Sequence, residues 1–296
     1  MRPKRRHPVR KILFILVCLS FIFSVPLHAF KKAEGYLFII GGGHRSDTMM
    51  KKFVELSKKS SNGKTVVFPM ASSEPAESGQ SMVEEFKNFG VKDVEYHVLN
   101  REQALKEENA KILDNVGCVY FTGGSQRRLT AALLNTPIHQ RLLKIYEEGG
   151  IIGGTSAGAA VMSEMMITGG EKRKVGEGHA FEKIQADNIV VTQGFGFIKT
   201  AIIDQHFVTR KRYNRLISLV AEHPELLGIG IDEATAVIVR PDETFEVFGE
   251  QNVVVYDATS AKIDILPSNT LSGFYIIMHV LKPGDLFDLK TKNPIK

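Results

Sequence analysis

The sequence contains no tryptophan, only two cysteines, and no low-complexity stretch or internal repeat. Its 296 residues are 43% hydrophobic and 24% charged, which excludes a disordered, collagen-like or disulfide-scaffold protein. No Cys-x-x-Cys motif occurs and the histidines are scattered, so we predict no metal site. The Gly41-Gly42-Gly43 run is not followed by the third glycine of G-x-G-x-x-G, because Ser46 stands there. We interpret the run as a tight turn and predict no cofactor.

Beyond the N-terminal segment, the chain has too few cysteines to form an internal disulfide. Cys18 lies in the N-terminal segment, and Cys118 is the one cysteine beyond it. Cys118 lies within the apolar run Gly117–Phe121, which has the composition of a strand. We predict a buried structural thiol there, in preference to a reactive one.

Positive charge is concentrated at the N-terminus, although the whole chain has a net charge of +5. Six cations and no acid precede an apolar run from Ile12 to Pro26, which is shorter than the roughly 20 residues of a comfortable bilayer span. We predict a signal peptide over residues 1–29 with cleavage after Ala29, and hence a secreted or periplasmic protein. The alternative is an uncleaved signal, which would be the only contact with a membrane.

Removal of residues 1–29 changes the net charge of the chain. The remaining 267 residues carry 32 cations against 33 acids, a net charge of −1. A nearly neutral chain of this kind gives no reason to expect a nucleic-acid partner.

Short apolar runs alternate with segments of helical period from Gly35 onward. We predict strands at 36–40, 65–68, 94–99 and 116–121, with helices at 47–58, 77–89, 102–113 and 137–148 between or after them. Apolar strands separated by helices indicate an α/β fold with a mostly parallel, flavodoxin-like sheet flanked by helices. A polar stretch from Thr168 to Asp187 is predicted to be a surface excursion. Beyond Gly228 the pattern becomes strand-rich, which predicts an antiparallel extension of one domain spanning residues 30–296.

The strongest local signal for chemistry is Gly154-Thr155-Ser156-Ala157-Gly158. It follows the apolar pair Ile151-Ile152 and precedes a helix-capable segment. A sharp strand-to-helix turn of this kind exposes a serine hydroxyl and directs a helix N-terminus at a developing oxyanion. We therefore predict that Ser156 is a nucleophile and that the Ala157 N–H helps to form an oxyanion hole.

A serine nucleophile needs a base. His206 follows the strand-like pair Ile202-Ile203, and functional groups of α/β folds gather at the carboxyl ends of strands. Three arginines follow it, at 210, 212 and 215. If a helix begins near Thr209, these cations oppose its macrodipole, which favours a role in binding a carboxylate-bearing substrate over a solvated basic face.

A second loop at a strand end could complete the oxyanion hole. Gly123-Gly124-Ser125-Gln126 follows the predicted strand 116–121. Its backbone N–H groups, with Gly124 as our candidate, could supply the second donor beside Ala157.

Taken together, the motifs around Gly124, Ser156 and His206, with the three arginines, resemble those of the cyanophycinases, a group of S51 serine peptidases related to aspartyl dipeptidase E. The resemblance runs from about Gly35 to Val255 and includes Ile229–Ala236. It implies a scaffold similar to class I glutamine amidotransferases. It also implies a mechanism in which Ser156 attacks a β-aspartyl amide and His206 acts as the base.

The resemblance further implies an acid between the serine and the histidine in the chain. Glu171 is our first candidate, because it closely follows Met165-Met166-Ile167, and Glu177 is the alternative. Asp204 is a weaker third option. By the same resemblance, the substrate site would contain Gln126, Asp204, Gln205, Arg210, Arg212 and Arg215.

The leading hypothesis from sequence is a secreted exopeptidase that releases β-Asp-Arg dipeptides from cyanophycin, a polyaspartate that carries arginine on its β-carboxyl groups. Alternatives are an S51 dipeptidase acting on Asp-X or isoaspartyl peptides, an α/β-hydrolase esterase, and a non-catalytic binding protein. The esterase reading expects its histidine near the C-terminus, whereas about 90 residues follow His206. A homodimer is the oligomer that the resemblance suggests.

Overall fold

The computed structural model describes residues 33–58, 63–173 and 181–296, all within one compact unit, Lys32–Lys296. The predicted signal peptide and its cleavage site therefore lie outside the described residues. Within them, no helix is long and apolar enough to cross a bilayer.

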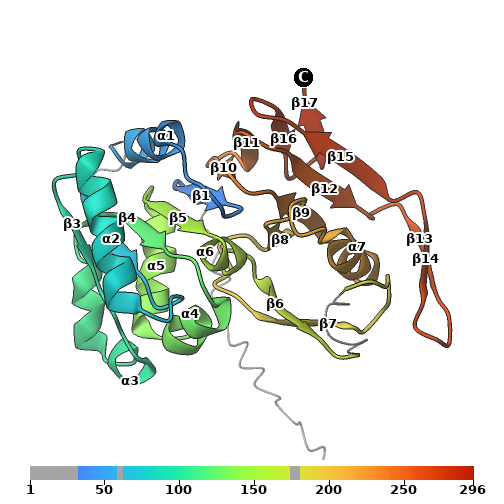
Figure 1. The fold of residues 1–296 in the computed structure, drawn as a ribbon, viewed down its shortest axis with the longest axis horizontal. Helices are drawn as coiled ribbons and strands as arrows, with labels where there is room; N and C mark the ends of the chain where they lie inside the picture. The colour runs from blue at the N-terminus through green and yellow to red at the C-terminus, as the bar shows by residue number, and fades with distance from the viewer. Residues whose placement is uncertain (1–32, 59–62, 174–180) are drawn as a thin grey trace, which may run out of the picture. The chain divides into compact units, whose positions relative to one another are not determined.

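A nine-stranded sheet forms the centre of this unit, in the order β17-β16-β11-β10-β1-β5-β4-β2-β3 (Figure 1). Its parallel part comprises β1 (Tyr36–Ile40), β5 (Ile151–Thr155), β4 (Val116–Phe121), β2 (Lys64–Phe68) and β3 (Val94–Tyr96). Its antiparallel part comprises β10 (Thr235–Val239), β11 (Thr244–Gly249), β16 (Leu286–Asp288) and β17 (Asn293–Ile295).

A second sheet of four strands has the order β15-β12-β9-β8. It contains β8 (Ala201–Gln205), β9 (Leu227–Ile231), β12 (Val253–Asp257) and β15 (Ile277–Leu281). Strands β8 and β9 are parallel, and the other pairs are antiparallel. Two hairpins complete the strands: β6 (Met165–Glu171) with β7 (Ile189–Gln193), and β13 (Lys262–Ile265) with β14 (Leu271–Phe274).

Helices cover both faces of the large sheet, and alternate side chains of each strand pack against helices on opposite faces. Phe38 and Ile40 of β1 pack with α1 (Asp47–Ser57) and α2 (Pro75–Asn88). Leu37 and Ile39 point into a second core with α4 (Gln126–Leu133), α5 (Pro137–Glu147), α6 (Ala157–Ala160) and one face of the second sheet. The other face of that sheet packs on α7 (Tyr213–Glu222). Burial on both faces explains why these strands are continuously apolar.

This architecture confirms the predicted fold class. Cys118 is buried in β4, as predicted, and burial raises the pKa of its thiol to about 12. The segment predicted as one helix over 102–113 instead forms α3 (Arg101–Ala104) and the 3₁₀ helix η1 (Glu107–Leu113), because Lys106 between them is extended.

Two further sequence predictions about local structure differ from the observed elements. The polar stretch predicted as a surface excursion begins inside strand β6, which pairs with β7. The helix expected near Thr209 begins at Tyr213, because His206 and Lys211 have left-handed backbone conformations that keep the segment in turns.

Candidate active site

The carboxyl ends of four strands from both sheets, β1, β5, β8 and β9, meet around one serine. Ser156 directly follows β5, whose last residue pairs with Ile40 of the parallel strand β1. His206 follows β8, and Glu233 lies two residues beyond the neighbouring strand β9. Two backbone hydrogen bonds join the sheets here, from His206 N to Gly41 O (2.8 Å) and from Ala234 N to Gly42 O (2.9 Å).

Ser156 has a backbone conformation that a non-glycine residue rarely adopts. Its φ is 54° and its ψ is −105°, and its N–H donates to Ile40 O at 3.0 Å. Such a conformation costs on the order of 1–3 kcal/mol and persists where the surroundings enforce it. The flanking glycines allow the turn to close, because a Cβ at Gly158 would lie 2.3 Å from Phe121 O. The predicted strand–turn–helix around Ser156 is therefore present.

Ser156, His206 and Glu233 form a continuous hydrogen-bonded chain. His206 Nε2 lies 2.9 Å from Ser156 Oγ, and His206 Nδ1 lies 2.5 Å from Glu233 Oε1. Because an ionised carboxylate can only accept hydrogen bonds, Nδ1 carries the ring proton and donates it to Glu233. Nε2 is then free to accept the proton of the serine hydroxyl, which is the arrangement of a serine nucleophile with an oriented base.

The glycine turn after β1 covers the imidazole. Gly42 has a φ of +116°, and a Cβ there would lie 2.3 Å from His206 Cε1. A side chain at this position would displace the base, so glycine is required by close approach as well as by backbone conformation. The tight turn predicted from sequence is present, and it helps to fix the histidine.

The residue that contacts His206 Nδ1 is not the acid predicted from sequence. Glu171 lies at the end of β6, and its carboxylate accepts a hydrogen bond from Asn188 Nδ2 at 3.1 Å. Glu177 lies outside the described residues. The expected order of serine, acid and histidine misplaced the acid, because Glu233 follows the histidine in the chain. The available signal was Asp232-Glu233 directly after the apolar strand Ile229-Gly230-Ile231.

Burial lowers the pKa of His206 below its ordinary value near 6.5. The hydrogen bond that His206 donates to Glu233 opposes this effect, whereas the cations of Arg210 and Arg212 reinforce it. The net direction is downward, so the imidazole is neutral at neutral pH and can act as a base.

Removal of the Arg210 charge should move the pH dependence of activity. Activity that needs neutral His206 is lost as the pH falls through the pKa of that histidine. Arg210 lowers this pKa, so we expect Arg210→Gln to shift the acidic limb of kcat/KM to higher pH, more strongly at low ionic strength. Lys211→Gln, which removes an adjacent exposed charge, is the matched control. An acidic limb that does not move in Arg210→Gln would exclude this electrostatic role.

The three predicted arginines have different environments. Arg215 is buried, and its guanidinium forms a bidentate ion pair with Asp204, with Nε 2.7 Å from Oδ2 and Nη2 bonded to Oδ1. Arg212 is largely buried and donates to Gln205 O at 2.6 Å. Burial lowers the pKa of Arg212 to about 10, so it remains a cation at neutral pH. The Arg210 side chain is 53% exposed.

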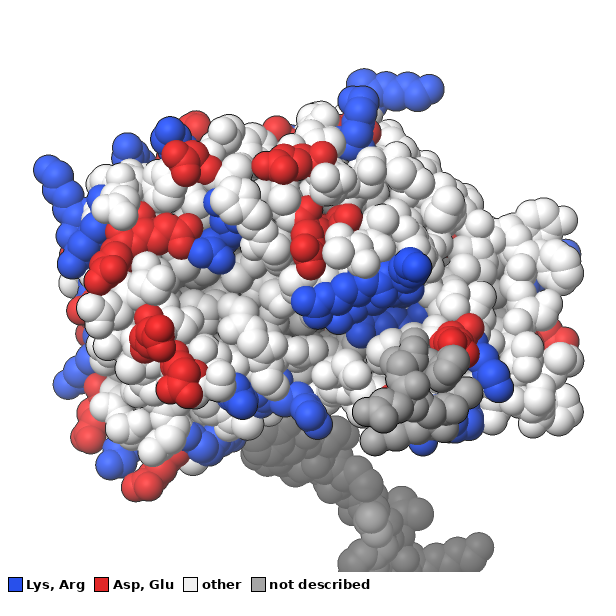
Figure 2. All heavy atoms as spheres, viewed as in Figure 1, with Lys and Arg blue, Asp and Glu red and all other residues white. Residues whose placement is uncertain are grey.

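The prediction that Asp204 and Arg215 contact the substrate disagrees with the structure, because both side chains are buried in an ion pair. Both side chains are almost inaccessible and satisfy each other's charge, so neither is free to bind a ligand in this conformation. Arg210 is exposed beside Glu233, whereas Arg212 is largely buried and also lies 3.8 Å from Asp204 Oδ1. Figure 2 shows basic side chains beside an uncharged hollow in the middle of the displayed face.

A stability measurement can test the structural role of Arg215. Arg215→Leu would leave the buried Asp204 carboxylate without its bidentate partner and with Arg212 3.8 Å away, so we expect the free energy of unfolding to fall by about 3 kcal/mol. Arg210→Leu is the control, because its side chain is half exposed and its loss should change stability little. Chemical denaturation measures both values. Wild-type stability in Arg215→Leu would contradict the structural role.

The two predicted glutamines also lie in the site region. Gln126 is buried, and its Nε2 donates to Ile167 O at 2.8 Å. Gln205 is also buried, and its Oε1 has no hydrogen-bond partner among the described residues. Gln205 Oε1 therefore has unused acceptor capacity but is closed to a ligand in this conformation, whereas Gln126 connects α4 to β6.

The predicted oxyanion donors lie on either side of the serine. Ala157 N–H is the first amide of α6, directly after Ser156. The loop Gly123-Gly124 is also close, because a Cβ at Gly123 would lie 3.5 Å from Ser156 Cβ. Gly124 has a φ of +133°, and a Cβ there would collide with Ala71 O. Its backbone can therefore adopt this turn only as glycine.

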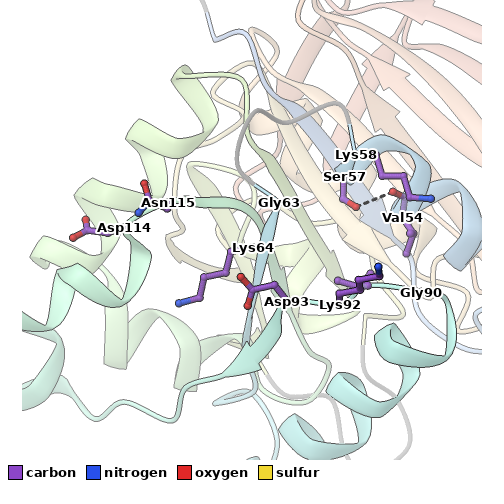
Figure 3. A pocket seen from close by; sticks show the side chains of 11 residues that line it. Val54, Ser57, Lys58, Gly63, Lys64, Gly90, Lys92, Asp93, Asp114 and Asn115 are labelled. Carbon is purple, nitrogen blue, oxygen red and sulfur yellow. Dashed lines mark hydrogen bonds between the residues drawn. The ribbon is translucent and has the colours of Figure 1, made fainter.

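No group of three or more His, Cys, Asp or Glu side chains suited to a metal ion occurs among the described residues. A cavity of about 710 Å³ lies at the opposite edge of the parallel sheet, at the amino ends of the strands (Figure 3). Residues around it include Lys64, Asp93 and Asp114, which precede or begin β2, β3 and β4. It is therefore separate from the serine site.

The chain is similar to known peptidases in sequence and in fold. The sequence model of peptidase family S51 matches residues 37–247. The chain is 34% identical over 235 residues to the cyanophycinase of Geminocystis herdmanii, covering 77% of this chain and 84% of that protein. It is 36% identical over 229 residues to the cyanophycinase of Trichormus variabilis, covering 75% and 74%.

Among solved structures, a peptidase from an acI-B1 actinobacterium superposes with a TM-score of 0.62 at 22% sequence identity, covering 87% of this chain and 98% of that one. This likeness concerns the fold alone. The family match and the curated relatives confirm the resemblance drawn from the sequence motifs, and the chain belongs to peptidase family S51, as a hydrolase of the serine peptidase type.

Proposed function

We propose that this peptidase hydrolyses cyanophycin to β-Asp-Arg dipeptides through an acyl-enzyme on Ser156. The single observation that carries the proposal is the hydrogen-bonded chain from Ser156 through His206 to Glu233 at the strand ends. The curated relatives at 34–36% identity, whose name is cyanophycinase, support the substrate.

The proposed reaction follows from the positions of these three side chains. Ser156 Oγ attacks the carbonyl carbon of the scissile amide as His206 Nε2 accepts the hydroxyl proton. A β-Asp-Arg product keeps its β-amide, so the scissile bond is a peptide bond of the polyaspartate backbone and not the β-aspartyl amide that the resemblance suggested. Glu233 stabilises the imidazolium through Nδ1. The Gly124 and Ala157 N–H groups bind the oxyanion. His206 then gives the proton to the leaving amine, which departs and leaves an ester on Ser156. Water, deprotonated by His206, cleaves that ester and restores the serine.

Charged groups beside the triad support a zwitterionic substrate. The arginyl groups of cyanophycin carry α-carboxylates, which are suitable partners for the guanidinium groups of Arg210 and Arg212. Asp204 and Arg215 hold this region in place through their buried ion pair.

A comparison of substrates tests the proposal. We expect the purified enzyme to release soluble dipeptide from insoluble cyanophycin and to act more slowly on Asp-X dipeptides. Faster turnover of Asp-X or isoaspartyl dipeptides would favour the dipeptidase alternative. The α/β-hydrolase esterase alternative loses support because the acid beside His206 follows the histidine in the chain, whereas that fold uses the order serine, acid, histidine.

Export of a single catalytic domain, residues 30–296, is part of the proposal and rests on the sequence alone. Extracellular cyanophycin would become accessible to an exported enzyme after other cells lyse. Expression from residue 1 in a bacterial host, with mass spectrometry of the exported product, tests it. The expected N-terminal residue is Phe30. An exported product that retains residues 1–29 would indicate an uncleaved anchor instead.

A further inference from the structure

Two acidic residues stand side by side after strand β9, and the proposed reaction uses only one of them. Glu233 contacts His206, whereas its neighbour Asp232 has no task in the triad. Asp232 is 4% exposed, although a carboxylate is costly to bury and buried acids are normally held in ion pairs. The burial of Asp232 therefore needs a partner or a function that compensates for it.

No ion pair compensates for the burial of Asp232 in the part of the chain that the structure describes. The nearby arginines at 210, 212 and 215 pair with Glu233 or Asp204 instead. The Oδ1 atom of Asp232 accepts the backbone N–H of Thr209 at 2.9 Å. That N–H belongs to the turn that directly follows the proposed base, so the buried carboxylate acts on the segment that carries the imidazole.

The turn after β8 holds the base in an unusual backbone conformation. The φ angle is 49° at His206 and 51° at Lys211, and both values are left-handed. Arg210 N donates to His206 O at 3.0 Å, which closes the turn. Such conformations persist only where the surroundings enforce them. The bond from the Thr209 N–H to Asp232 is one such constraint, because it is made midway along the turn.

The backbone of Asp232 is itself held on two sides. Its N–H donates at 3.3 Å to the carbonyl oxygen of Asn252, directly before β12. Its own carbonyl oxygen packs against the turn after β1, where a Cβ on Gly41 would lie 2.1 Å away. Gly41 O also accepts the backbone N–H of His206 at 2.8 Å. Asp232 is therefore a fixed point from which its carboxylate can hold the turn.

We propose that Asp232 is a positioning residue that acts through the Thr209 N–H to hold the imidazole of His206 in line with the nucleophile. The two adjacent acids then have different tasks. Glu233 orients the ring and stabilises its charge, and Asp232 fixes the backbone that carries the ring. The proposal rests on the role proposed above for His206, but not on the identity of the peptide that is cleaved.

Amide variants distinguish the two acids. Asp232→Ala removes the acceptor of the Thr209 N–H. A displacement of the base by about 1 Å can cost about 100-fold in rate, so we expect kcat to fall about 100-fold with little change in KM. Asp232→Asn keeps an oxygen at the same position, so its kcat should stay near the wild-type value. Glu233→Gln also keeps the shape of its side chain, but it favours the wrong tautomer of the imidazole and should lose activity.

The measurement is steady-state kinetics of the protein expressed from residue 1. The substrates are a soluble trimer of β-Asp-Arg units and, in parallel, an isoaspartyl dipeptide. The variants are compared on whichever of the two the wild type cleaves. Turnover of the dipeptide alone would contradict the proposed substrate, while the comparison of variants would still test the role of Asp232.

Asp257→Ala is the matched control. Asp257 is also buried, at 8% exposed, and accepts the Thr259 N–H at 2.8 Å. It ends β12 beside the first residues of β9, so it lies at the opposite end of that strand from Asp232. Its replacement should lower stability but leave the kcat of the folded enzyme unchanged. A loss of stability is thereby separated from a displaced base.

Asp232→Ser is the second variant if Asp232→Ala does not fold. Its hydroxyl is one bond short of the Oδ1 position, so its kcat should fall as well. A wild-type kcat in a folded Asp232→Ala or Asp232→Ser enzyme would overturn the proposal. So would an equal loss in Asp232→Asn, because the charge rather than the acceptor would then matter, and so would an equal loss in Asp257→Ala. A wild-type kcat in Glu233→Gln would refute the triad on which the proposal rests.

Discussion

Replacement of Ser156 by Ala is expected to lower kcat on cyanophycin by a factor on the order of 10⁴ or more. The variant loses the hydroxyl oxygen that lies 2.9 Å from His206 Nε2, so no covalent intermediate can form. The fold should be unchanged, because alanine tolerates the same turn and the backbone bond to Ile40 O remains. Dipeptide release measured by mass spectrometry, with thermal unfolding of the same sample, checks both expectations.

Ser57→Ala is a suitable control for this experiment. Ser57 lies at the far end of α1, and its hydroxyl donates to Val54 O within the helix. Its loss should leave turnover at the wild-type rate. Retention of more than about a tenth of wild-type activity by a folded Ser156→Ala variant would exclude Ser156 as the nucleophile.

The second large effect is expected from Glu233→Gln. A glutamine amide can donate to His206 Nδ1 and so favour the tautomer in which Nε2 carries the proton. That tautomer cannot accept the serine proton, and the analogous change in other triads costs about 10⁴ in kcat. We therefore expect a loss of about 10³ to 10⁴, with little change in KM.

Glu171→Gln is the informative comparison for Glu233→Gln. Glu171 bonds to Asn188 on the β6–β7 hairpin, so its variant should retain most of the activity. The two variants make the same chemical change in two candidate acids. A large loss in Glu171→Gln together with normal activity in Glu233→Gln would restore the acid predicted from sequence and contradict the geometry.

The location of the nucleophile and base could be predicted because both follow apolar strands. Ile151-Ile152 and Ile202-Ile203 are strand signals, and the carboxyl ends of parallel strands are where α/β folds place functional groups. Glu233 obeys the same rule, because β9 is the parallel neighbour of β8. It was missed because an assumed chain order of catalytic residues was given more weight than the strand-end rule.

Other features depend on tertiary contacts that a local pattern does not contain. The spacing of Arg210, Arg212 and Arg215 predicts a basic cluster but does not tell which guanidinium is buried. The ion pair of Arg215 with Asp204 joins α7 to the end of β8, eleven residues away in the chain. Likewise, the apolar run Phe274–Val280 does not form one strand, because β14 ends at Phe274 and β15 begins at Ile277.

We propose above that this S51 peptidase cleaves cyanophycin through Ser156. The most direct measurement is the soluble product released from insoluble cyanophycin by wild type and by Ser156→Ala, identified by mass spectrometry. We expect β-Asp-Arg dipeptide to accumulate with wild type and to be absent with the variant. A folded wild-type enzyme that releases no β-Asp-Arg, or a Ser156→Ala variant that releases it at the wild-type rate, would contradict the account.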